Sequence, residues 1–398
     1  MLFRSLHLHT EYSLVDSVVR IQAEGGDAPG LMDAVVAAGM PAVALTDQSN
    51  LFAMVKFYRA AQSAGVKPII GIDLRVRELG ERQEPSTLVL LCQNDIGYRN
   101  LTRLVSRSYL EGQHRGIATI DRSWLSADNL VGLIALSGAR DGDLGRAIVH
   151  SREEEACKAI ESWLALFGDR YYIELQRTGR EAEERYIHGA LEMAADYGVP
   201  VVATNDVRFI RAEDYESHEA RVCIHDGALL GDAKRRRRYS PEQYLKSPRE
   251  MTRLFEDVPE AVDNSFEIAR RCNLELKLGK SVLPAYPVPG NLSTEDFLRE
   301  EARRGLLERL EQLRKTVVQG RTIAREEYEE RLASEISVIC QMGFAGYFLI
   351  VADFIRWARE NGVPVGPGRG SGAGSLVAYS IGITDYMEIG RASCRERV

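Results

Sequence analysis

Two histidines near the start of the chain, His7 and His9, are of a type and spacing that can hold a metal ion. They lie two apart in a stretch that predicts a strand, Arg4–His9, so both imidazoles should face the same side. Imidazole nitrogens and carboxylate oxygens are common metal ligands. Carboxylates recur near the ends of the predicted strands, at Glu11, Asp16, Asp47, Asp73, Glu174 and Asp206. The pattern indicates a candidate metal site if those strand ends meet.

Predicted strands alternate with helical stretches up to about residue 210. Short β-branched runs predict seven strands: Arg4–His9, Pro41–Thr46, Pro68–Val76, Leu88–Cys92, Val131–Ser137, Tyr171–Leu175 and Val201–Thr204. Helical periodicity between them predicts helices such as Gly30–Gly39, Leu51–Ala64 and Glu181–Tyr197. This alternation predicts an α/β fold, specifically a barrel of seven βα units. In such a barrel the loops that follow the strands converge on one rim, where the polar residues would gather.

Four motifs in this region, HLHTEYSLVD, ALTDQSN, PIIGIDLRV and VVATNDVRF, resemble those of the polymerase and histidinol phosphatase (PHP) domain family. The resemblance implies a PHP-type (β/α)7 barrel. In members that keep phosphoesterase activity it also implies two or three metal ions, held by His, Asp, Glu and Cys, that activate water for attack on phosphate.

The chain departs from the active PHP pattern at several ligand positions. The lost positions carry Gln48, Thr87, Ala139 and Arg208, and Asp73 replaces a glutamate. Five site remnants survive: His7, His9, Asp16, Asp73 and Asp206. An arginine cannot act as a ligand and brings a permanent positive charge. We therefore expect a degenerate site without tightly bound metal, in which Arg208 pairs with leftover carboxylates in a polar plug that Glu11, Asp47 and Glu174 could join.

The rest of the chain has a different pattern. The basic run Lys234–Arg238 fits either a solvated loop or a phosphate contact. Helical patterns cover 248–273 and 294–362, and the proline-containing stretch 279–291 reads as a connector. These patterns predict a first domain over residues 1–275 and a second over 276–385.

A glycine-rich loop follows the last long predicted helix, which should end at Gly362 before a short strand, Val363–Val365. Its sequence, GPGRGSG over 366–372, has glycine at every second position and precedes a predicted helix, Ala373–Ser380. Backbone amides of such a loop can approach an anion closely, with Arg369, Gly370 and Ser371 as phosphate-binding candidates. A tight glycine turn between strand and helix is the structural alternative.

The string YFLIVADFIRWARENGVPVGPGRGSGAGSLVAYSIGITD resembles the opening of the palm domain in the bacterial DNA polymerase III alpha subunit family. The resemblance implies a PHP barrel, a mainly helical segment and the beginning of a nucleotidyltransferase-like palm. It implies that Gly370 and Ser371, assisted by Arg369, hold the triphosphate of an incoming nucleotide. In the family the catalytic carboxylates that bind Mg²⁺ come later, so we expect this fragment to be inactive. The last thirteen residues, 386–398, depart from the family pattern and read as a non-native tail.

The same resemblance suggests partners and alternative functions. Primer-template DNA, deoxynucleoside triphosphates and other replicase subunits are the expected partners of a full-length replicative polymerase. A degenerate PHP domain resembles a docking platform for the separate proofreading exonuclease subunit. The alternative is a metal-dependent PHP phosphoesterase or exonuclease, which the two histidines favour and the four lost positions oppose.

Composition excludes several other classes. The chain has 398 residues, enough for two or three domains, and 51 Lys and Arg against 58 Asp and Glu give a net charge of -7. A chain-wide basic surface for nucleic acid is therefore absent. The sequence lacks an apolar run of about 18–20 residues and a signal-peptide core, so we expect a cytoplasmic protein without a membrane span. Six scattered cysteines without a CxxC pair argue against a disulfide framework or a structural zinc site.

Overall fold

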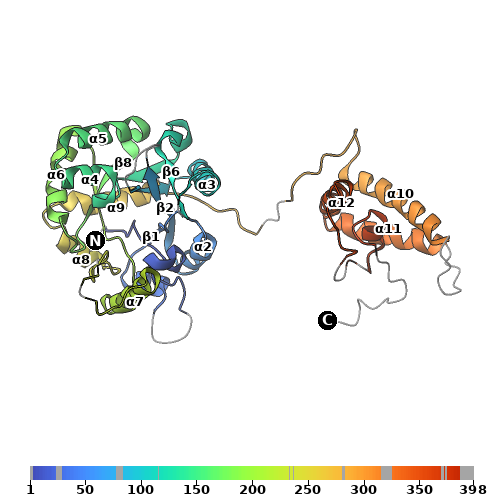
Figure 1. Ribbon diagram of the computed structural model, residues 1–398, viewed down its shortest axis with the longest axis horizontal. Helices are drawn as coiled ribbons and strands as arrows, with labels where there is room; N and C mark the ends of the chain where they lie inside the picture. The colour runs from blue at the N-terminus through green and yellow to red at the C-terminus, as the bar shows by residue number, and fades with distance from the viewer. Residues whose placement is uncertain are drawn as a thin grey trace. The chain divides into compact units, whose positions relative to one another are not determined.

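The computed structural model divides the chain into two compact units, residues 1–276 and 277–398 (Figure 1). It describes residues 3–23, 29–77, 84–114, 116–232, 234–235, 237–279, 283–314, 325–368, 372 and 374–385. The predicted phosphate-binding residues Arg369, Gly370 and Ser371 and the tail 386–398 lie outside the described residues. The predicted domains over residues 1–275 and 276–385 and their functions stay predictions.

A curled sheet forms the centre of the first unit. Its strand order is β1-β2-β3-β7-β8-β9, and β6 also pairs with β2. The bounds are β1 Ala42–Leu45, β2 Lys67–Arg77, β3 Ser86–Cys92, β6 Ile120–Asp121, β7 Leu133–Leu136, β8 Tyr171–Gln176 and β9 Val201–Thr204. The N-terminal segment links the two ends of this order, because Ser5 bridges Val43 and Leu8 bridges Val207. Six of the seven predicted strand regions are therefore strands of this sheet, and the region Arg4–His9 joins it only through these two bridges.

One strand runs against the expected βα alternation. β3 follows β2 and pairs with it antiparallel, and β3 also pairs antiparallel with β7, whereas β1–β2, β7–β8 and β8–β9 are parallel. A parallel neighbour requires a long crossover, usually a helix, while a short connection permits only antiparallel pairing. Eight residues, 78–85, separate β2 from β3, so the alternation of strands and helices is interrupted there.

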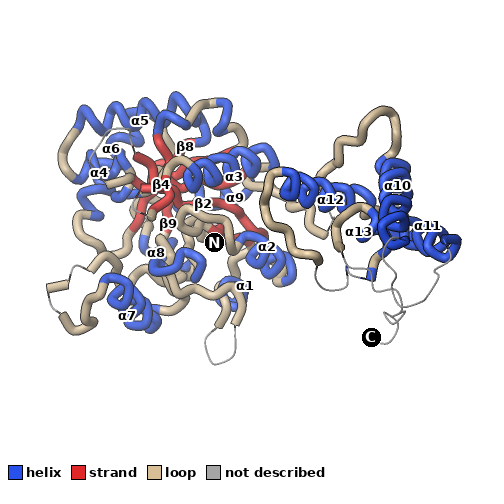
Figure 2. Tube along the Cα trace, turned by 45° about the vertical axis from the view of Figure 1, so that its right-hand side comes forward, coloured by secondary structure: helices blue, strands red, loops and turns tan. Residues whose placement is uncertain are grey.

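Helices surround the sheet, as Figure 2 shows by the red strands inside blue helices. Their bounds are α1 Leu31–Ala37, α2 Met54–Ser63, α3 Asp95–Leu110, α4 Asp143–Val149, α5 Glu153–Phe167, α6 Glu183–Tyr197, α7 Tyr215–Asp226, α8 Pro248–Leu254 and α9 Pro259–Arg271. A short β4–β5 hairpin, Gln113–His114 and Ile117–Ala118, lies outside the main sheet. The helices predicted near 30–39, 51–64 and 181–197 are confirmed as α1, α2 and α6.

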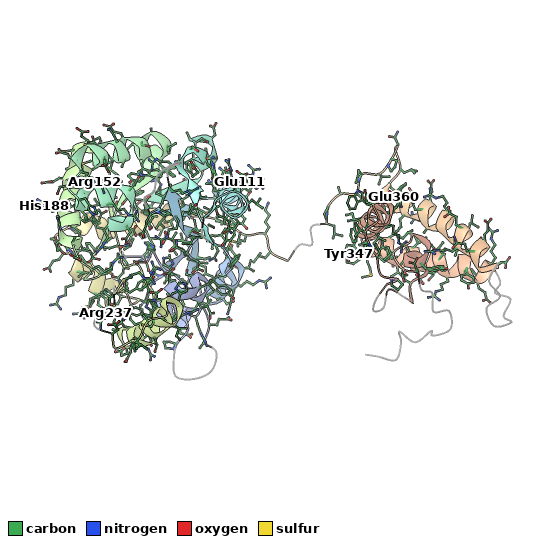
Figure 3. All side chains as sticks on the ribbon, viewed as in Figure 1. Glu111, Arg152, His188, Arg237, Tyr347 and Glu360 are labelled. Carbon is green, nitrogen blue, oxygen red and sulfur yellow. The ribbon has the colours of Figure 1, made fainter. Side chains whose placement is uncertain are left out.

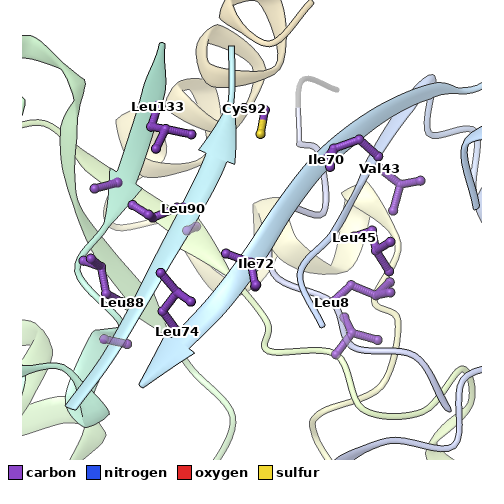
Figure 4. Packing of buried hydrophobic residues seen from close by; sticks show 14 of the residues in the cluster. Leu8, Val43, Leu45, Ile70, Ile72, Leu74, Leu88, Leu90, Cys92 and Leu133 are labelled. Atoms are coloured by element: carbon purple, nitrogen blue, oxygen red, sulfur yellow. The ribbon is translucent and has the colours of Figure 1, made fainter. Parts of the chain in front are cut away.

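The two faces of the strands contribute to separate apolar clusters. Ile70, Ile72 and Leu74 of β2 face one large cluster, which includes Leu88, Leu90 and Cys92 of β3 (Figure 4). Ile69 and its neighbours on the opposite face form a smaller cluster with Leu6, Val89, Leu91, Ile134, Leu136, Val202 and part of α9. Strand periodicity of two residues produces this division, because successive side chains point to opposite faces.

The face that carries the smaller cluster becomes polar along the strands. On β2 it runs from Ile69 to Asp73, and on β8 it runs from Tyr172 to Glu174. On β9, Val202 is followed on that face by Thr204. The carboxyl ends of the parallel strands therefore deliver buried polar groups to one place, as a barrel rim requires.

The second unit is helical over its described residues. It contains α10 Thr294–Arg314, α11 Arg325–Gln341, α12 Ala345–Glu360 and α13 Leu376–Ser380. Its core repeats at helical spacing, with Leu298, Ala302 and Leu306 on α10 and Tyr328, Leu332 and Ile336 on α11. α12 ends near the left-handed Gly362, as predicted, with φ +73°. The predicted strand Val363–Val365 is wrong, because this segment is irregular backbone without a pairing partner among the described residues.

In the described part of the chain no single helix is long and apolar enough to cross a membrane, whereas α11 and α12, bent by 111° at their break, satisfy the length and composition criteria only as a pair.

Candidate functional site

Four ligand atoms from three parts of the first unit converge at the polar end of the sheet. His7 Nε2 lies 3.2 Å from His9 Nε2, 3.7 Å from Asp73 Oδ2 and 3.6 Å from Asp206 Oδ1. His9 Nε2 lies 3.4 Å from Asp73 Oδ2 and 3.6 Å from Asp206 Oδ1. All four side chains are buried. We call this set, His7, His9, Asp73 and Asp206, the four-ligand centre.

Hydrogen bonds behind the centre orient its side chains. His7 Nδ1 lies 2.7 Å from Glu174 Oε1, and His9 Nδ1 lies 3.1 Å from Ser13 Oγ, so both Nε2 atoms turn inward. Gln243 Nε2 donates to Asp206 Oδ2 at 2.7 Å, which leaves Oδ1 toward the centre. Such outer contacts fix the ring and carboxylate orientations that a metal site requires.

The spacing of the four-ligand centre fits one divalent ion. Ligands at about 2.0–2.2 Å in a tetrahedron stand roughly 3.3–3.6 Å apart, close to the 3.2–3.7 Å that separates the two Nε2 atoms from each other and from either carboxylate. The mutually close ligand group consists of His7, His9 and Asp206 and does not include Asp73. Asp73 Oδ1 is also buried without a hydrogen-bond partner. Two imidazoles and two carboxylates suit zinc or a similar ion. The prediction of a degenerate ligand set is therefore not supported by this geometry. The absence of tightly bound metal stays a prediction, and the convergence of these ligands argues against it.

Arg208 lies against the same centre. Its Nη2 is 2.7 Å from Asp206 Oδ1, and both side chains are buried. Burial opposes the ionisation of Asp206, but Arg208, His7 and Arg180 outweigh it and hold the pKa of Asp206 well below its usual range. The predicted pairing of Arg208 with a leftover carboxylate is thus present. Arg208 and a metal ion would compete for the same Asp206 oxygen.

The two imidazoles differ in charge when no metal is bound. Burial alone would lower the pKa of His7, but Glu174, Asp206 and Asp73 raise it to about 10. Burial, Arg208 and His7 hold the pKa of His9 well below its ordinary value. A charged His7 can therefore donate from Nε2 to a neutral His9. That proton would occupy the Nε2 lone pair that a metal ion needs, so protonation and metal binding are alternatives.

The other lost ligand positions are filled by non-ligating contacts. Arg75 Nη2 donates to Gln48 Oε1 at 3.0 Å, and its Nη1 lies 3.4 Å from Thr87 Oγ1. Ala139 is buried and presents only a methyl group. Within the part of the chain that the structure describes, one group of three or more candidate ligands is found, containing His7, His9 and Asp206. A second or third ion therefore has no ligand set among these residues.

Comparison with known proteins identifies both units. The PHP domain family profile matches residues 5–178, and the profile of the bacterial DNA polymerase III alpha NTPase domain matches residues 296–389. The chain is 50% identical to the DNA polymerase III subunit alpha of Pseudomonas aeruginosa over 383 residues, 96% of this chain and 32% of that protein. The chain matches the N-terminal third of bacterial DNA polymerase III alpha subunits.

Other relatives of this alpha-subunit family agree with that match. The Escherichia coli K12 protein is 50% identical over 385 residues and the Xylella fastidiosa Temecula1 protein 45% identical over 392, each over 96% of this chain. The chain spans about a third of the length of these relatives. Among solved structures, an amidohydrolase from Chromobacterium violaceum with bound sulfate has a TM-score of 0.34 at 14% identity, covering 52% of this chain and 87% of its own.

Three carboxylates predicted near the PHP site lie outside its centre. Asp16 Oδ1 accepts from the Tyr239 hydroxyl and is not part of the ligand group. Asp47 accepts from Thr10 and Ser13, at 2.6–2.7 Å. Glu11 is partly exposed beside Arg20 and Lys56. Asp47, with Glu174, thus forms the layer behind the histidines, while Asp16 and Glu11 do not join them.

Two arginines of the basic run Lys234–Arg238 form ion pairs within the first unit. Arg235 forms a buried ion pair with Glu219 at 2.5 Å, and Arg238 pairs with Asp226 at 2.8 Å. Arg237 lies at the periphery of the unit (Figure 3), and Arg236 is outside the described residues. These pairs favour a structural loop over a phosphate contact.

Several residues that build the PHP site were missed in the sequence. Arg75 follows Asp73 by two residues on the same strand face, so strand periodicity could have found it. Gln243 and Tyr239 reach the site from a loop that has no repeating pattern, and no local signal marks them.

Proposed function

We propose that the chain is the N-terminal region of a replicative DNA polymerase, whose reaction is template-directed addition of a deoxynucleoside triphosphate to a primer 3′ end. The observation that carries this proposal is 50% identity to a DNA polymerase III alpha subunit over 96% of the chain, with the PHP and alpha NTPase profiles in series. Primer-template DNA, nucleotides and other replicase subunits are the partners that follow from it.

The polymerase chemistry would be divided between this chain and residues beyond it. Nucleotidyl transfer uses carboxylates that hold two Mg²⁺ ions, which activate the primer hydroxyl and stabilise the leaving pyrophosphate. We place the triphosphate contacts at Arg369, Gly370 and Ser371, and the Mg²⁺-binding carboxylates after residue 385. The chain by itself should then bind nucleotide without extending a primer.

For the PHP domain we propose a structural role rather than hydrolysis. The ligand group among the described residues, His7, His9 and Asp206, would hold a single ion, whereas the active PHP pattern implies two or three. The guanidinium of Arg208 forms an ion pair with Asp206, one of these ligands, at 2.7 Å. No second ligand group is found among the described residues. The domain would also serve as the docking platform for the proofreading exonuclease.

The second candidate function, a metal-dependent phosphoesterase, is favoured by one observation. His7, His9, Asp73 and Asp206 converge as a ligand set would. The two candidates differ in metal stoichiometry, because the active PHP pattern implies two or three ions and this centre fits one.

Three assays on the purified chain test these proposals. Elemental analysis without chelator should give at most one Zn, Mn or Fe per chain. Hydrolysis of p-nitrophenyl phosphate or single-stranded DNA should stay at the level of the His9→Ala variant. Two or more ions per chain, lost together with phosphoesterase activity in His9→Ala, would establish the second candidate instead. Primer extension with Mg²⁺ should be absent, and template-dependent extension abolished by Ser371→Ala would place catalytic carboxylates within residues 1–385.

A further inference from the structure

A cavity of about 490 Å³ lies in the first unit, and no residue of the four-ligand centre is among those that line it. It is bounded by the end of β2, the start of β3, α4 and one side of α5. Arg152, which immediately precedes α5 and is labelled in Figure 3, is one of its lining residues. Cavities of about 300–1,000 Å³ are the usual size of small-ligand sites. We call it the β2–α5 cavity.

Cationic side chains dominate the lining of the β2–α5 cavity. Five cations line it, against three carboxylates, so the lining carries a net charge of +2. The cations are Arg77, Arg122, Arg146, Arg152 and Lys158. The whole chain has a net charge of -7, so this surface has the opposite sign from the protein as a whole.

Two of the five cations are neutralised by carboxylates of the same lining. Arg122 Nη1 lies 2.8 Å from Asp143 Oδ2, and its Nη2 donates to Ser162 Oγ at 2.7 Å. Arg152 pairs with Glu155 at 2.7 Å. These two ion pairs account for two of the three carboxylates. The third, Glu84, is at an exposed position.

The other three cations have no carboxylate partner. Arg146 donates to the backbone carbonyl oxygens of Glu84 and Pro85, at 2.6 and 2.8 Å. Burial lowers the pKa of Arg146 in spite of nearby carboxylates, so they do not offset the cost of removing its charge from water. Arg77 and Lys158 form no hydrogen bond or ion pair within the described part of the chain. Three uncompensated cations therefore line one cavity.

We propose that the β2–α5 cavity binds a phosphate group, either of inorganic phosphate or pyrophosphate or of a nucleotide. A phosphate monoester carries about -1.5 to -2 charges at pH 7 and three oxygens, which matches the net charge of the lining and its three uncompensated cations. A carboxylate offers one charge and two oxygens. Guanidinium groups bind phosphate oxygens through paired N–H donors, and an ammonium group adds a point charge. This site is separate from the proposed polymerase function and does not depend on it.

Two variants remove the proposed phosphate contacts without removing a contact inside the protein. Arg77→Gln and Lys158→Gln each delete one cation that has no partner among the described residues, so both should melt like wild type when no ligand is added. Arg185→Gln makes the same charge change at an exposed position of α6 that does not line the cavity, and it is the matched control. Arg369→Ala distinguishes this cavity from the glycine-rich loop.

Isothermal titration calorimetry of the whole chain with sodium phosphate, pyrophosphate and deoxyadenosine monophosphate tests the proposal. At least one of them should bind wild type, with a Kd about tenfold higher or more in Arg77→Gln and Lys158→Gln. The Kd in Arg185→Gln and Arg369→Ala should equal that of wild type. The ligand with the lowest Kd identifies the source of the phosphate group.

Four outcomes would overturn the proposal. They are the absence of saturable binding of all three ligands to wild type, unchanged Kd values in Arg77→Gln and Lys158→Gln, an equal loss of affinity in Arg185→Gln, and a loss confined to Arg369→Ala. The last outcome would assign the phosphate to the glycine-rich loop and would leave the proposed polymerase function intact.

Discussion

The PHP centre and the glycine-rich loop are built in opposite ways. The four-ligand centre draws His7 and His9 from one end of the first unit and Asp206 from the other, and almost every charged group in it is buried. The phosphate-binding candidates of the second unit are three consecutive residues, Arg369 to Ser371, and the contacts that flank them are partly exposed ion pairs and helix caps. A buried, discontinuous site depends on the balance of its charges, whereas water screens the charges of partly exposed ion pairs.

This difference predicts that single charge changes affect the two regions unequally. Removing one partner of a buried ion pair leaves the other charge buried and uncompensated. Removing one partner of an exposed ion pair costs little, because water solvates the charge that remains. Charge changes at Arg208 and His7 in the first unit and a packing change at Gly305 in the second sharpen that contrast, from the largest expected effect to the smallest.

Arg208→Ala should destabilise the first unit most. It leaves Asp206 buried beside Asp73 and Glu174, at a cost of about 3–5 kcal/mol. Thermal and urea unfolding measure it. Arg238→Ala, which breaks an exposed pair with Asp226, is the matched control and should cost under about 1 kcal/mol. Zinc added to Arg208→Ala should recover part of the loss, because the ion replaces the guanidinium charge. A midpoint unchanged from wild type would mean that Arg208 does not balance the centre.

The first unit should lose stability as the pH rises, in the presence of a chelator. The pKa of His7 is raised to about 10 in the folded protein, against about 6.5 in an unfolded chain. The charged His7 therefore contributes its full stabilisation below about pH 6.5, and this contribution declines as the pH approaches 10. The expected loss is a few kcal/mol, measured by urea unfolding between pH 6 and 10. His7→Gln should flatten the profile, and an equally steep profile in that variant would assign the effect to another group.

Gly305→Ala should destabilise the second unit by about 1–3 kcal/mol, because it overpacks a close contact. A Cβ at Gly305 of α10 would stand 1.9 Å from the backbone oxygen of Ser380 in α13. Gly346→Ala on α12 is the control, since its Cβ meets only Thr294 Cγ2 at 3.7 Å. That change should be neutral or stabilise the helix by about 0.5–1 kcal/mol. Equal melting midpoints for the two variants would show that α10 and α13 do not touch so closely in solution.

Local pattern determined much of this protein. Short β-branched runs indicated six of the seven predicted strands, helical spacing indicated α10 to α12, and the order of motifs indicated the alpha-subunit relationship, because each of these signals is carried within a few consecutive turns or strand residues. The pairing of Arg208 with Asp206 also followed from the unusual residue type at that position.

Tertiary structure alone decided the rest. The reversal of β3 depends on a short connection, and the irregular segment 363–365 lacks a neighbouring strand with which to pair, among the described residues. Whether His7, His9, Asp73 and Asp206 converge depends on sheet curvature and register, which link residues up to about two hundred positions apart. The turn of Asp16 toward Tyr239 has the same cause. Periodicity assigns a residue to a face, but only the packed fold sets the distance between two faces and hence which charges compensate one another.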